Sequence, residues 1–492
     1  MDYIGYNDII TKRSLVISNI RKSIHGQWSS KLLFIFAATG SAVGLGNIWK
    51  FPWMTAESGG GAFVLVYILS VIFLALPIMC AEILIGKRGK QNPVNTLRTL
   101  SNESSYYTKK ETDLSLNRSI KVKKQFSDTE LFSNWEFVGW MGIVAGILIL
   151  SFYSVIAGWT ISYIIKSITG SFALITAAGS TAKFEEFISD PEKLILWHTI
   201  FMILTCFIVS KGIKSGIERA IKFLIPGLFI LLIGLAIYAS SLSGFNDAMK
   251  YLFIADFQKI NNSVILSAMS MAFFSLSIGM GSLMVYGSYL PDNTSIFQVG
   301  SAVAFFDTFV AILAGIIIFP IVFTYNLDPN TAGPGLIFQT LPIAFGSMDF
   351  GGVIATSFFI LLFFAAITSS ISLIEPAITF VVEKFSVSRI YATNILGVVT
   401  WVLGIFTVLS FNNLSDFKLF GMTIFDNIDY LTSKIMLPLG GLLMALFVGY
   451  IMKRAIVSSE LNSNKLLISL WFIVLKVFSP ILLVLIFING IL

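Results

Sequence analysis

Hydrophobic residues along this chain gather in long runs that short polar segments separate. A helix needs about 20 mainly apolar residues to cross the hydrocarbon core of a bilayer. Eleven runs meet that length, so the pattern predicts an all-α polytopic membrane protein with eleven transmembrane helices. The predicted spans lie at 31–55, 61–86, 137–168, 194–210, 216–240, 263–290, 297–325, 350–384, 388–411, 429–453 and 465–490.

Composition agrees with this class. The 492 residues are 56% hydrophobic and only 12% charged, and the mean hydropathy of +0.84 is too high for a soluble protein of this length. The first 27 residues are polar, which argues against a cleavable signal peptide. The two cysteines, Cys80 and Cys206, lie in apolar runs, so neither a disulfide framework nor a metal site is expected.

Basic residues predict the orientation, because Lys and Arg favour cytoplasmic loops. They concentrate before the first span and in every second loop after it, whereas the alternate loops hold few. The N-terminus is therefore expected inside and, with eleven spans, the C-terminus outside a plasma or inner cell membrane. The net charge of +6 is explained by this inner face, so no nucleic-acid partner is expected.

Two loops differ in character. The polar segment 87–136 mixes both signs of charge, which favours a disordered or loosely helical loop at the lipid headgroups over a docking element for a partner. The outer segment YNLDPNTAGPGLIFQTLP, 325–342, alternates Gly and Pro with apolar residues and predicts a structured cap.

Glycines interrupt two spans at matching places. The first contains GSAVGLGNIWKFP at 40–52, and the sixth contains FFSLSIGMGS at 273–282. A GxxxG pattern alone favours close helix packing, but Gly46, Asn47 and the second interruption favour a ligand site, since broken helices inside a membrane line cavities. Because the two spans are five apart, the halves are predicted to form an inverted repeat.

Broken helices expose two kinds of backbone group. Free carbonyls suit a small hard cation, and free N–H groups suit a carboxylate, so a zwitterionic amino acid beside sodium would use both. The eighth span adds FFAAITSSIS, in which the hydroxyls of Thr368 and Ser369 lie on the same helix face as the Ala365 carbonyl. The alternative is that these hydroxyls bond to their own helix.

Ionisable residues inside spans are costly and invite a functional hypothesis. Asp307 is the candidate for a direct cation ligand. For Lys50 and Asp429, which lie near the outer ends of their spans, the alternative is snorkelling to the interface. His198 is interpreted as a packing residue. Glu82 and Glu375 complete the set.

Several long segments resemble the neurotransmitter:sodium symporter family in its prokaryotic amino-acid branch. They include residues 40–89, KGIKSGIERAIKFLIPGLF, AFFSLSIGMGS, DTFVAILAGIIIFP and FFAAITSSISLIEP, and the resemblance covers nearly the whole chain except the tip of the 87–136 loop. It implies the leucine-transporter fold, with a cytoplasmic N-terminal latch (1–30), two inverted five-helix repeats (31–240 and 241–453) and one extra span (454–492).

The resemblance also implies two sodium sites. The first falls on the Ala42 carbonyl, Asn47, Ser275 and Asp307, together with the carboxylate of the substrate. The second falls on the carbonyls of Gly40, Val43 and Ala365 and on the hydroxyls of Thr368 and Ser369.

The resemblance also implies a substrate site. The substrate carboxylate would meet the N–H groups of Leu45 and Gly46 and the hydroxyl of Tyr153. Its ammonium would face carbonyls of Ala42, Phe274 and Ser275 and the Ser277 hydroxyl, and Ser369 borders the site. The side-chain pocket would consist of Ile149, Ile156, Met280 and Leu373, where the flexible Met280 suits several shapes.

Three positions refine the expected activity. Amine carriers of the family have an aspartate where this chain has Gly44, which favours an α-amino acid. Chloride-dependent relatives have a neutral asparagine and a serine where this chain has Asp307 and Ala311, so chloride is not expected as a co-substrate.

The gates follow by resemblance as well. Lys50 and Asp429 take the outer charge pair, where lysine lacks the bidentate fork of arginine and Met271 replaces a supporting glutamine. Trp28 matches the inner latch, with His25 in place of its arginine and with Glu383 and Tyr289 as partners; a histidine there predicts pH sensitivity. Gly216 and Pro226 match a motif for helix unwinding in the fifth span.

These features predict a sodium-coupled secondary active transporter that moves a neutral, hydrophobic or aromatic amino acid inward by alternating access. It makes and breaks no bond and is not expected to be an enzyme. Two alternatives are a membrane receptor or sensor that binds the amino acid without transport, and a proton-coupled carrier of the same fold. The latter is disfavoured by the Thr368 and Ser369 hydroxyls. A monomer or a weak homo-oligomer is expected.

Overall fold

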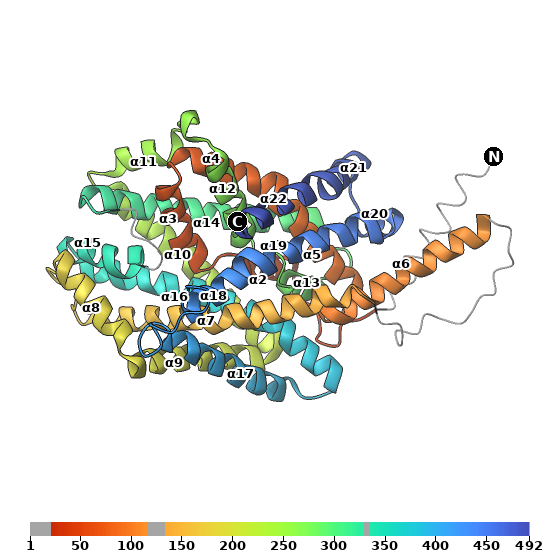
Figure 1. The fold of residues 1–492 in the computed structure, drawn as a ribbon, viewed down its shortest axis with the longest axis horizontal. Helices are drawn as coiled ribbons and strands as arrows, with labels where there is room; N and C mark the ends of the chain where they lie inside the picture. Colours follow the sequence, from red (N-terminus) through yellow and green to blue (C-terminus); the bar gives the residue numbers. More distant parts are fainter. Residues whose placement is uncertain (1–20, 116–132, 329–334, 492) are drawn as a thin grey trace.

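The fold is seen in a computed structural model that describes residues 21–115, 133–328 and 335–491. The first twenty residues of the predicted latch, the tip of the 87–136 loop and residues 329–334 of the outer cap lie outside this part of the chain. Within the described residues the protein is helical, and the only extended pairing is a single bridge between Leu419 and Met422. Figure 1 shows the helices running largely side by side in one elongated bundle.

Nine helices of the described chain are long and apolar enough to cross a membrane, and a tenth span consists of two helices bent by 55°. The first helix of this bent span is α2 (Lys31–Ala42). The second is formed by η1 (Gly46–Lys50) and α3 (Phe51–Glu57) together. The remaining spans of the first half are α4–η2–α5 (Gly61–Ser70, Val71–Ala75, Leu76–Gly89), α7 (Glu136–Ile168), α9 (Pro191–Ser210) and η3–α10 (Ile213–Ile217, Glu218–Ser240).

The second half holds the other spanning helices. The predicted sixth span is divided into α12 (Asn262–Ser275) and the short α13 (Ser282–Ser288), so it does not count as a continuous helix. It is followed by α14 (Ile296–Thr324), α16 (Gly351–Phe385), α17 (Arg389–Leu409), α18–η6–α19–η7 (Ile424–Asp429, Tyr430–Met436, Leu437–Leu446, Phe447–Ile451) and α21–η8–α22 (Lys465–Ile473, Val474–Phe478, Ser479–Ile491).

Shorter helices lie in the connections between spans. They are α6 (Pro93–Ser115), α8 (Ala177–Ser189), α11 (Phe245–Phe253), η4 (Phe257–Lys259), η5 (Leu336–Thr340), α15 (Leu341–Ser347) and α20 (Arg454–Leu461). The fold class is the predicted one, whereas the division into repeats at 31–240 and 241–453 and a final segment at 454–492 stays a prediction.

The breaks in the first and sixth spans have a local cause. The backbone at Val43 is extended, with ψ of 104°, and ends α2. Between α12 and α13 the backbone is left-handed at Gly279 and Gly281, with φ of +94° and +77°, and also at Ser277, with φ of +53°. A side chain strains this conformation and glycine does not, so the GMG sequence places the break.

Helices α7 and α16 form the centre of the bundle. In each helix, 78% of an apolar 18-residue segment is buried inside the protein. Glycines of α7 allow its backbone to approach its neighbours. A Cβ on Gly146 would lie 2.5 Å from the Leu373 carbonyl oxygen of α16, and a Cβ on Gly142 would lie 3.0 Å from the Met280 carbonyl. These contacts fix α7 beside both α16 and the broken sixth span.

The loop after α5 is more ordered than the sequence predicted. Pro93–Ser115 forms one helix, α6, whose first half buries Leu97 and Leu100 against the bundle. The Arg98 guanidinium donates two hydrogen bonds of 2.7 Å to the Glu136 carboxylate at the start of α7. The far end of α6 projects beyond the bundle (Figure 1). The apolar positions 97 and 100, three apart, are the sequence signal for this docking.

Candidate functional site

The two breaks face each other across a small cavity in the middle of the bundle. The cavity has a volume of about 40 Å³, which is room for a few water molecules. Its lining comes from the first, third, sixth and eighth predicted spans: Ser41, Ala42, Gly44, Gly46, Asn47, Ile149, Tyr153, Phe274, Ser275, Ser277, Met280, Ser369 and Leu373. Every one of these residues except Ser41 is among the predicted ligands or substrate contacts.

A first cluster of oxygen atoms lies at one side of this cavity. The Asn47 amide nitrogen donates to Oδ1 of Asp307 at 2.7 Å and to the Ser275 hydroxyl at 3.0 Å. The Ser275 hydroxyl in turn donates to Oδ2 of Asp307 at 2.5 Å. All three side chains are at most 1% exposed, so a carboxylate is held inside the membrane by hydrogen bonds. Oxygen donors around a buried negative charge suit a small hard cation.

Tyr67 belongs to the same cluster and was not predicted. Its hydroxyl donates to the Ser275 hydroxyl at 3.2 Å and to Oδ2 of Asp307 at 3.5 Å. The only sequence signal was a tyrosine inside an otherwise apolar run, a pattern that also fits a packing residue.

A second cluster of oxygen atoms lies between α2 and α16. The Ser369 hydroxyl donates to the carbonyls of Gly40 at 3.1 Å and Val43 at 3.0 Å. The Thr368 hydroxyl donates to the Ala365 carbonyl at 3.1 Å, which is the back-bonded arrangement weighed as the alternative. The structure thus brings together all five predicted residues of the second sodium site, and their role as ligands stays a prediction.

Gly40 and Gly44 make this close approach possible. A Cβ on Gly40 would lie 3.0 Å from Cβ of Thr368, so a larger residue would separate α2 from α16. A Cβ on Gly44 would lie 2.9 Å from the Ser369 hydroxyl and 3.0 Å from the Tyr153 hydroxyl. The arrangement therefore leaves no room for an aspartate at position 44.

The predicted carboxylate contacts also converge. The Leu45 N–H donates to the Tyr153 hydroxyl at 3.2 Å, so the first span and α7 already meet where the substrate carboxylate is expected. The Ser277 hydroxyl donates to the Ser41 carbonyl at 3.0 Å across the two breaks. Ser41 was overlooked, although its position between Gly40 and Ala42 in the broken segment was a usable signal.

Apolar side chains form the remaining wall of the cavity. Ile149, Met280 and Leu373 line it, together with the Phe274 ring, against which a Cβ on Gly46 would lie at 2.8 Å. Ile156 is buried but does not line the cavity.

The predicted outer charge pair is not in contact in this structure. The Lys50 ammonium lies 4.1 Å from the centre of the Phe274 ring, a cation–π contact that covers the cavity lining. The Asp429 carboxylate instead accepts a hydrogen bond of 2.7 Å from the Ser433 hydroxyl one turn later. Lys50 thus contacts a ring of the cavity lining and forms no direct ion pair with Asp429.

At the opposite end the predicted latch residues are assembled. Nε2 of His25 lies 3.1 Å from Oε1 of Glu383, and their side chains are 6% and 9% exposed. The Trp28 indole N–H donates to the Tyr286 carbonyl, and the Trp28 backbone N–H donates to the Tyr289 carbonyl, both at 3.0 Å. The N-terminal segment is therefore tied to both α13 and α16.

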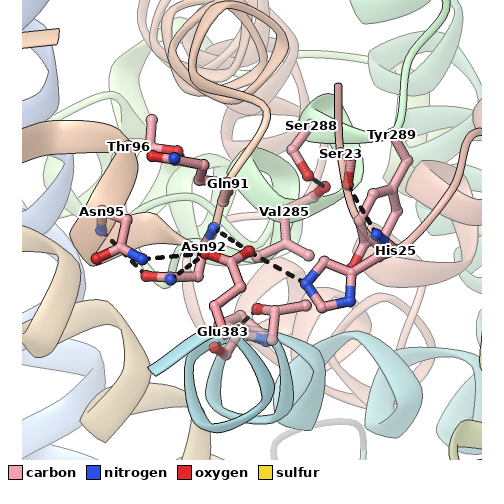
Figure 2. A network of polar contacts seen from close by, with 12 residues as sticks. Ser23, His25, Gln91, Asn92, Asn95, Thr96, Val285, Ser288, Tyr289 and Glu383 are labelled. Carbon is pink, nitrogen blue, oxygen red and sulfur yellow. Dashed lines mark hydrogen bonds and ion pairs between the residues drawn. The ribbon is translucent and has the colours of Figure 1, made fainter. Parts of the chain in front are cut away.

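Two asparagines complete this latch and were not predicted. The Asn92 backbone N–H donates to Oε1 of Glu383 at 2.8 Å, and the Asn95 amide donates to Oε2 at 3.1 Å. Figure 2 shows the Glu383 carboxylate between the His25 ring on one side and these amides on the other. The start of α6 thus shares the carboxylate with the N-terminal segment.

Further buried carboxylates reinforce the same end. Glu375 accepts from the Tyr289 hydroxyl at 2.8 Å and from Arg389 at 2.5 Å. Glu218, the first residue of α10, accepts from the backbone N–H and the hydroxyl of Ser29 at 2.7 and 2.8 Å. Glu82, which the sequence also singled out, instead supports the sixth-span break. Its carboxylate accepts a hydrogen bond of 3.1 Å from the Gly279 N–H.

The two positions of the unwinding motif lie on either side of Glu218. Gly216 lies in the π-helical turn η3, where a Cβ would be 2.1 Å from the Ile208 carbonyl oxygen. Pro226 lies inside the continuous helix α10. Unwinding at these positions stays a prediction. No group of three or more His, Cys, Asp or Glu side chains that could hold a metal ion occurs in the part of the chain that the structure describes.

A bundle of membrane-spanning helices with two spans broken opposite each other, around a cavity lined by carbonyls, hydroxyls and one carboxylate, defines a multi-pass membrane transporter. The chain belongs to the Sodium:neurotransmitter symporter family, whose family model matches residues 25–104 and 181–492. It is therefore a sodium-dependent transporter that binds a small molecule within the membrane, and it is not an enzyme, as predicted. The matched residues leave out α7 and hence Tyr153.

Relatives match almost the whole chain. An uncharacterized sodium-dependent transporter, YhdH, of Bacillus subtilis is 34% identical over 467 residues, which cover 94% of this chain and 97% of YhdH. An uncharacterized sodium-dependent transporter of Haemophilus influenzae is also 34% identical, over 94% of this chain and 97% of its own. The crystal structure of MhsT in complex with L-phenylalanine superimposes with a TM-score of 0.82 at 40% identity and covers 94% of this chain and 99% of MhsT.

The contacts of Gly44 yield a test of the cavity. We expect Gly44→Ala to lower substrate uptake by about tenfold or more, because the added methyl group would overpack the contact of Ser369 with Tyr153. Gly352→Ala is the matched control, since its Cβ would meet only the Ser167 carbonyl oxygen at an ordinary 3.6 Å. Uptake of labelled substrate at equal protein levels measures both, and unchanged uptake by Gly44→Ala would show that this approach of the helices is not needed.

Proposed function

We propose that this protein couples the inward movement of sodium to that of a neutral, hydrophobic or aromatic amino acid. The observation that carries this proposal is the pair of oxygen clusters, one around Asp307 and one around Ser369, on the two sides of a single cavity. Each cluster offers carbonyl, amide or hydroxyl oxygens to a sodium ion, and together they support two sodium sites. Because sodium and substrate would share this space, binding of one favours binding of the other.

The lining of the cavity supports the substrate class. Gly44 brings no carboxylate to the place where the substrate carboxylate is expected, so the substrate must supply its own negative charge. The Ile149, Met280 and Leu373 side chains leave an apolar wall for the substrate side chain. MhsT, which shares the fold at 40% identity, was crystallised with L-phenylalanine, a substrate of the proposed kind.

Alternating access follows from the contacts at the two ends. A cavity of about 40 Å³ holds a few waters, so an amino acid requires the broken spans to separate. Release toward the N-terminal side requires the Trp28 and His25 contacts to break. Release of the Lys50 and Phe274 cover opens the other side, which we place outside the cell from the distribution of basic residues. Both clusters and both gates come from one chain, which supports a single chain as the transport unit.

Uptake by reconstituted protein tests the proposal directly. In proteoliposomes with an inward sodium gradient, we expect accumulation of labelled neutral apolar amino acids such as phenylalanine and leucine, and loss of accumulation when the gradient is collapsed. Arginine, glutamate and serotonin are expected to be poor substrates. Sodium-dependent binding without accumulation would instead identify a receptor, and accumulation driven by a proton gradient alone would contradict sodium coupling.

We further propose that transport does not need chloride. Asp307 places a fixed negative charge in the first cluster, and Ala311, one turn later, offers no hydroxyl to an anion. Replacing all chloride by gluconate is therefore expected to leave the rate of sodium-driven uptake unchanged within error. Loss of uptake in gluconate, with recovery when chloride is restored, would refute this.

The latch leads to a pH prediction. Histidine changes its charge between about pH 5 and 8, and protonated His25 would donate a charge-assisted bond to Glu383, which strengthens the latch at acidic pH. Tyr289 also faces His25, and the centres of the two rings are 6.0 Å apart. If opening of the latch side limits the rate of transport, the rate of uptake should fall severalfold from pH 8 to pH 6. We expect His25→Arg to flatten this pH profile.

Trp28→Phe is the control for a general weakening of the latch, because it removes the indole hydrogen bond without changing a charge. The same pH profile in His25→Arg and in the unaltered protein would show that His25 does not set the pH dependence.

A further inference from the structure

Two cations on the membrane-facing surface lack carboxylate partners. Lys476 lies near the middle of the Lys465–Ile488 span, and Arg454 begins α20. Neither forms an ion pair with a carboxylate among the residues that the structure describes, and both contact aromatic rings instead. Charged side chains within membrane spans usually pair with one another or line a polar path, so this arrangement calls for an explanation.

Both cations surround the same ring. The Arg454 guanidinium carbon is 5.3 Å and the Lys476 ammonium 6.0 Å from the centre of the Phe472 ring. The ammonium is also 5.0 Å from the Tyr450 ring, and the Arg454 guanidinium donates to the Ser469 hydroxyl at 2.9 Å. The Ser469 hydroxyl is the only hydrogen-bond acceptor of these two cations among the described residues, so their other N–H donors stay available. Two positive charges beside one ring in a medium of low dielectric constant favour a nearby anion.

The backbone holds Lys476 in this place. The Tyr450 hydroxyl donates to the Lys476 carbonyl at 2.9 Å, and a Cβ on Gly449 would lie 3.1 Å from Cγ of Lys476. The small Gly449 therefore lets the lysine stem lie directly on η7. Tyr450 is in the last turn of its span (Ile424–Ile451), so the Lys476 backbone lies beside the end of that span.

The surroundings are those of a lipid surface. Tyr450 is 59% exposed, and α21 and η8 present Leu470, Ile473 and Val477, which are each about half exposed, on the outside of the bundle. An anion that reaches this place between apolar side chains must itself carry apolar chains, or it would leave water at a cost. Basic pockets at the ends of membrane helices bind phospholipid headgroups in this way.

The site lies on the same side of the protein as the latch. Glu460 of α20 accepts from Arg88 at 3.0 Å, and Arg88 shares Glu103 of α6 with Arg21 of the N-terminal segment. Figure 1 shows α20, α21 and α6 at the same end of the bundle. With the proposed orientation this is the inner leaflet of the membrane, while binding itself depends on neither the orientation nor the transport function.

We propose that Arg454 and Lys476 form a binding site for the headgroup phosphate of an anionic phospholipid, with the Tyr450 and Phe472 rings as its walls. The guanidinium offers paired N–H donors to phosphate oxygens, the ammonium adds a point charge, and the exposed leucine, isoleucine and valine side chains contact the acyl chains. The site distinguishes anionic from zwitterionic lipid by its two unneutralised charges.

Lipid retention tests this site. The full chain, in nanodiscs of equal parts phosphatidylcholine and phosphatidylglycerol, is extracted into mild detergent, and the lipids that stay bound are counted by native mass spectrometry. We expect the unaltered protein to retain phosphatidylglycerol in preference to phosphatidylcholine. A basic residue near the membrane contributes about a fivefold gain in affinity for anionic lipid, so Arg454→Gln and Lys476→Gln should each weaken retention severalfold and the double variant more.

Lys211→Gln is the matched control. The Lys211 ammonium also lies over a ring, 3.6 Å from the centre of Phe207, but the described part of the chain brings no second cation to that ring. It is expected to retain phosphatidylglycerol as the unaltered protein does. The charge-preserving pair Arg454→Lys with Lys476→Arg should also retain it, which keeps the test valid if the glutamine variants fold poorly.

Three results would overturn the proposal. They are equal retention of phosphatidylglycerol by the double glutamine variant, equal retention of phosphatidylcholine by the unaltered protein, and displacement of the lipid by millimolar inorganic phosphate, which would make the site one for a free anion. Sodium-driven uptake in the same nanodisc-derived preparations, after reconstitution, is a separate readout: its loss with intact lipid retention would count against the proposed transport function alone.

Discussion

The structure depends on one constraint, which is that a backbone N–H or C=O inside a membrane must have a polar partner. An unsatisfied group costs several kcal/mol there, so a broken helix persists only where other parts of the protein supply partners. Here the sixth-span break and the continuous helix α16 supply partners for the first break. The Ser277 hydroxyl bonds the Ser41 carbonyl, and Ser369 bonds the carbonyls of Gly40 and Val43. The cavity therefore lies where the first break is satisfied by the sixth span and by α16, and these bonds use the same groups that a ligand would use.

The buried carboxylates follow the same rule. Asp307 is held by Asn47 and Ser275, and Glu375 by Tyr289 and Arg389. Hydrogen bonds to a charged group contribute about 1.5–3 kcal/mol each, enough for two or three of them to offset much of the cost of burial. Asp307 differs from Glu375 in having no cation beside it among the described residues, which is the electrostatic reason to expect one to bind there.

The two ends of the bundle are held together by different kinds of contact. At the Lys50 end, a cation–π contact joins the Lys50 ammonium to the Phe274 ring. At the latch end, His25, Trp28 and Ser29 bond partners on α16, α13 and α10. The latch therefore links several helices, and α6 joins it because Asn95, together with Asn92 just before the helix, shares Glu383 with His25.

The sequence by itself determined the class of the protein and the positions of the spans, because apolar runs and glycine interruptions act locally along the chain. It placed nearly all residues around the cavity, among them Ser369 and Gly44, mainly through motifs long enough to resemble a known family. It could not show that Tyr67 and Ser41 join the cavity, that α6 packs on the bundle, or that Lys50 prefers a ring to Asp429. Those outcomes depend on which side chains of distant segments come within 3 or 4 Å, as when Arg454 and Lys476 meet around Phe472. The hydropathy of a single segment carries no information about distances between side chains of different segments. Only the packing of helices against one another decides those distances.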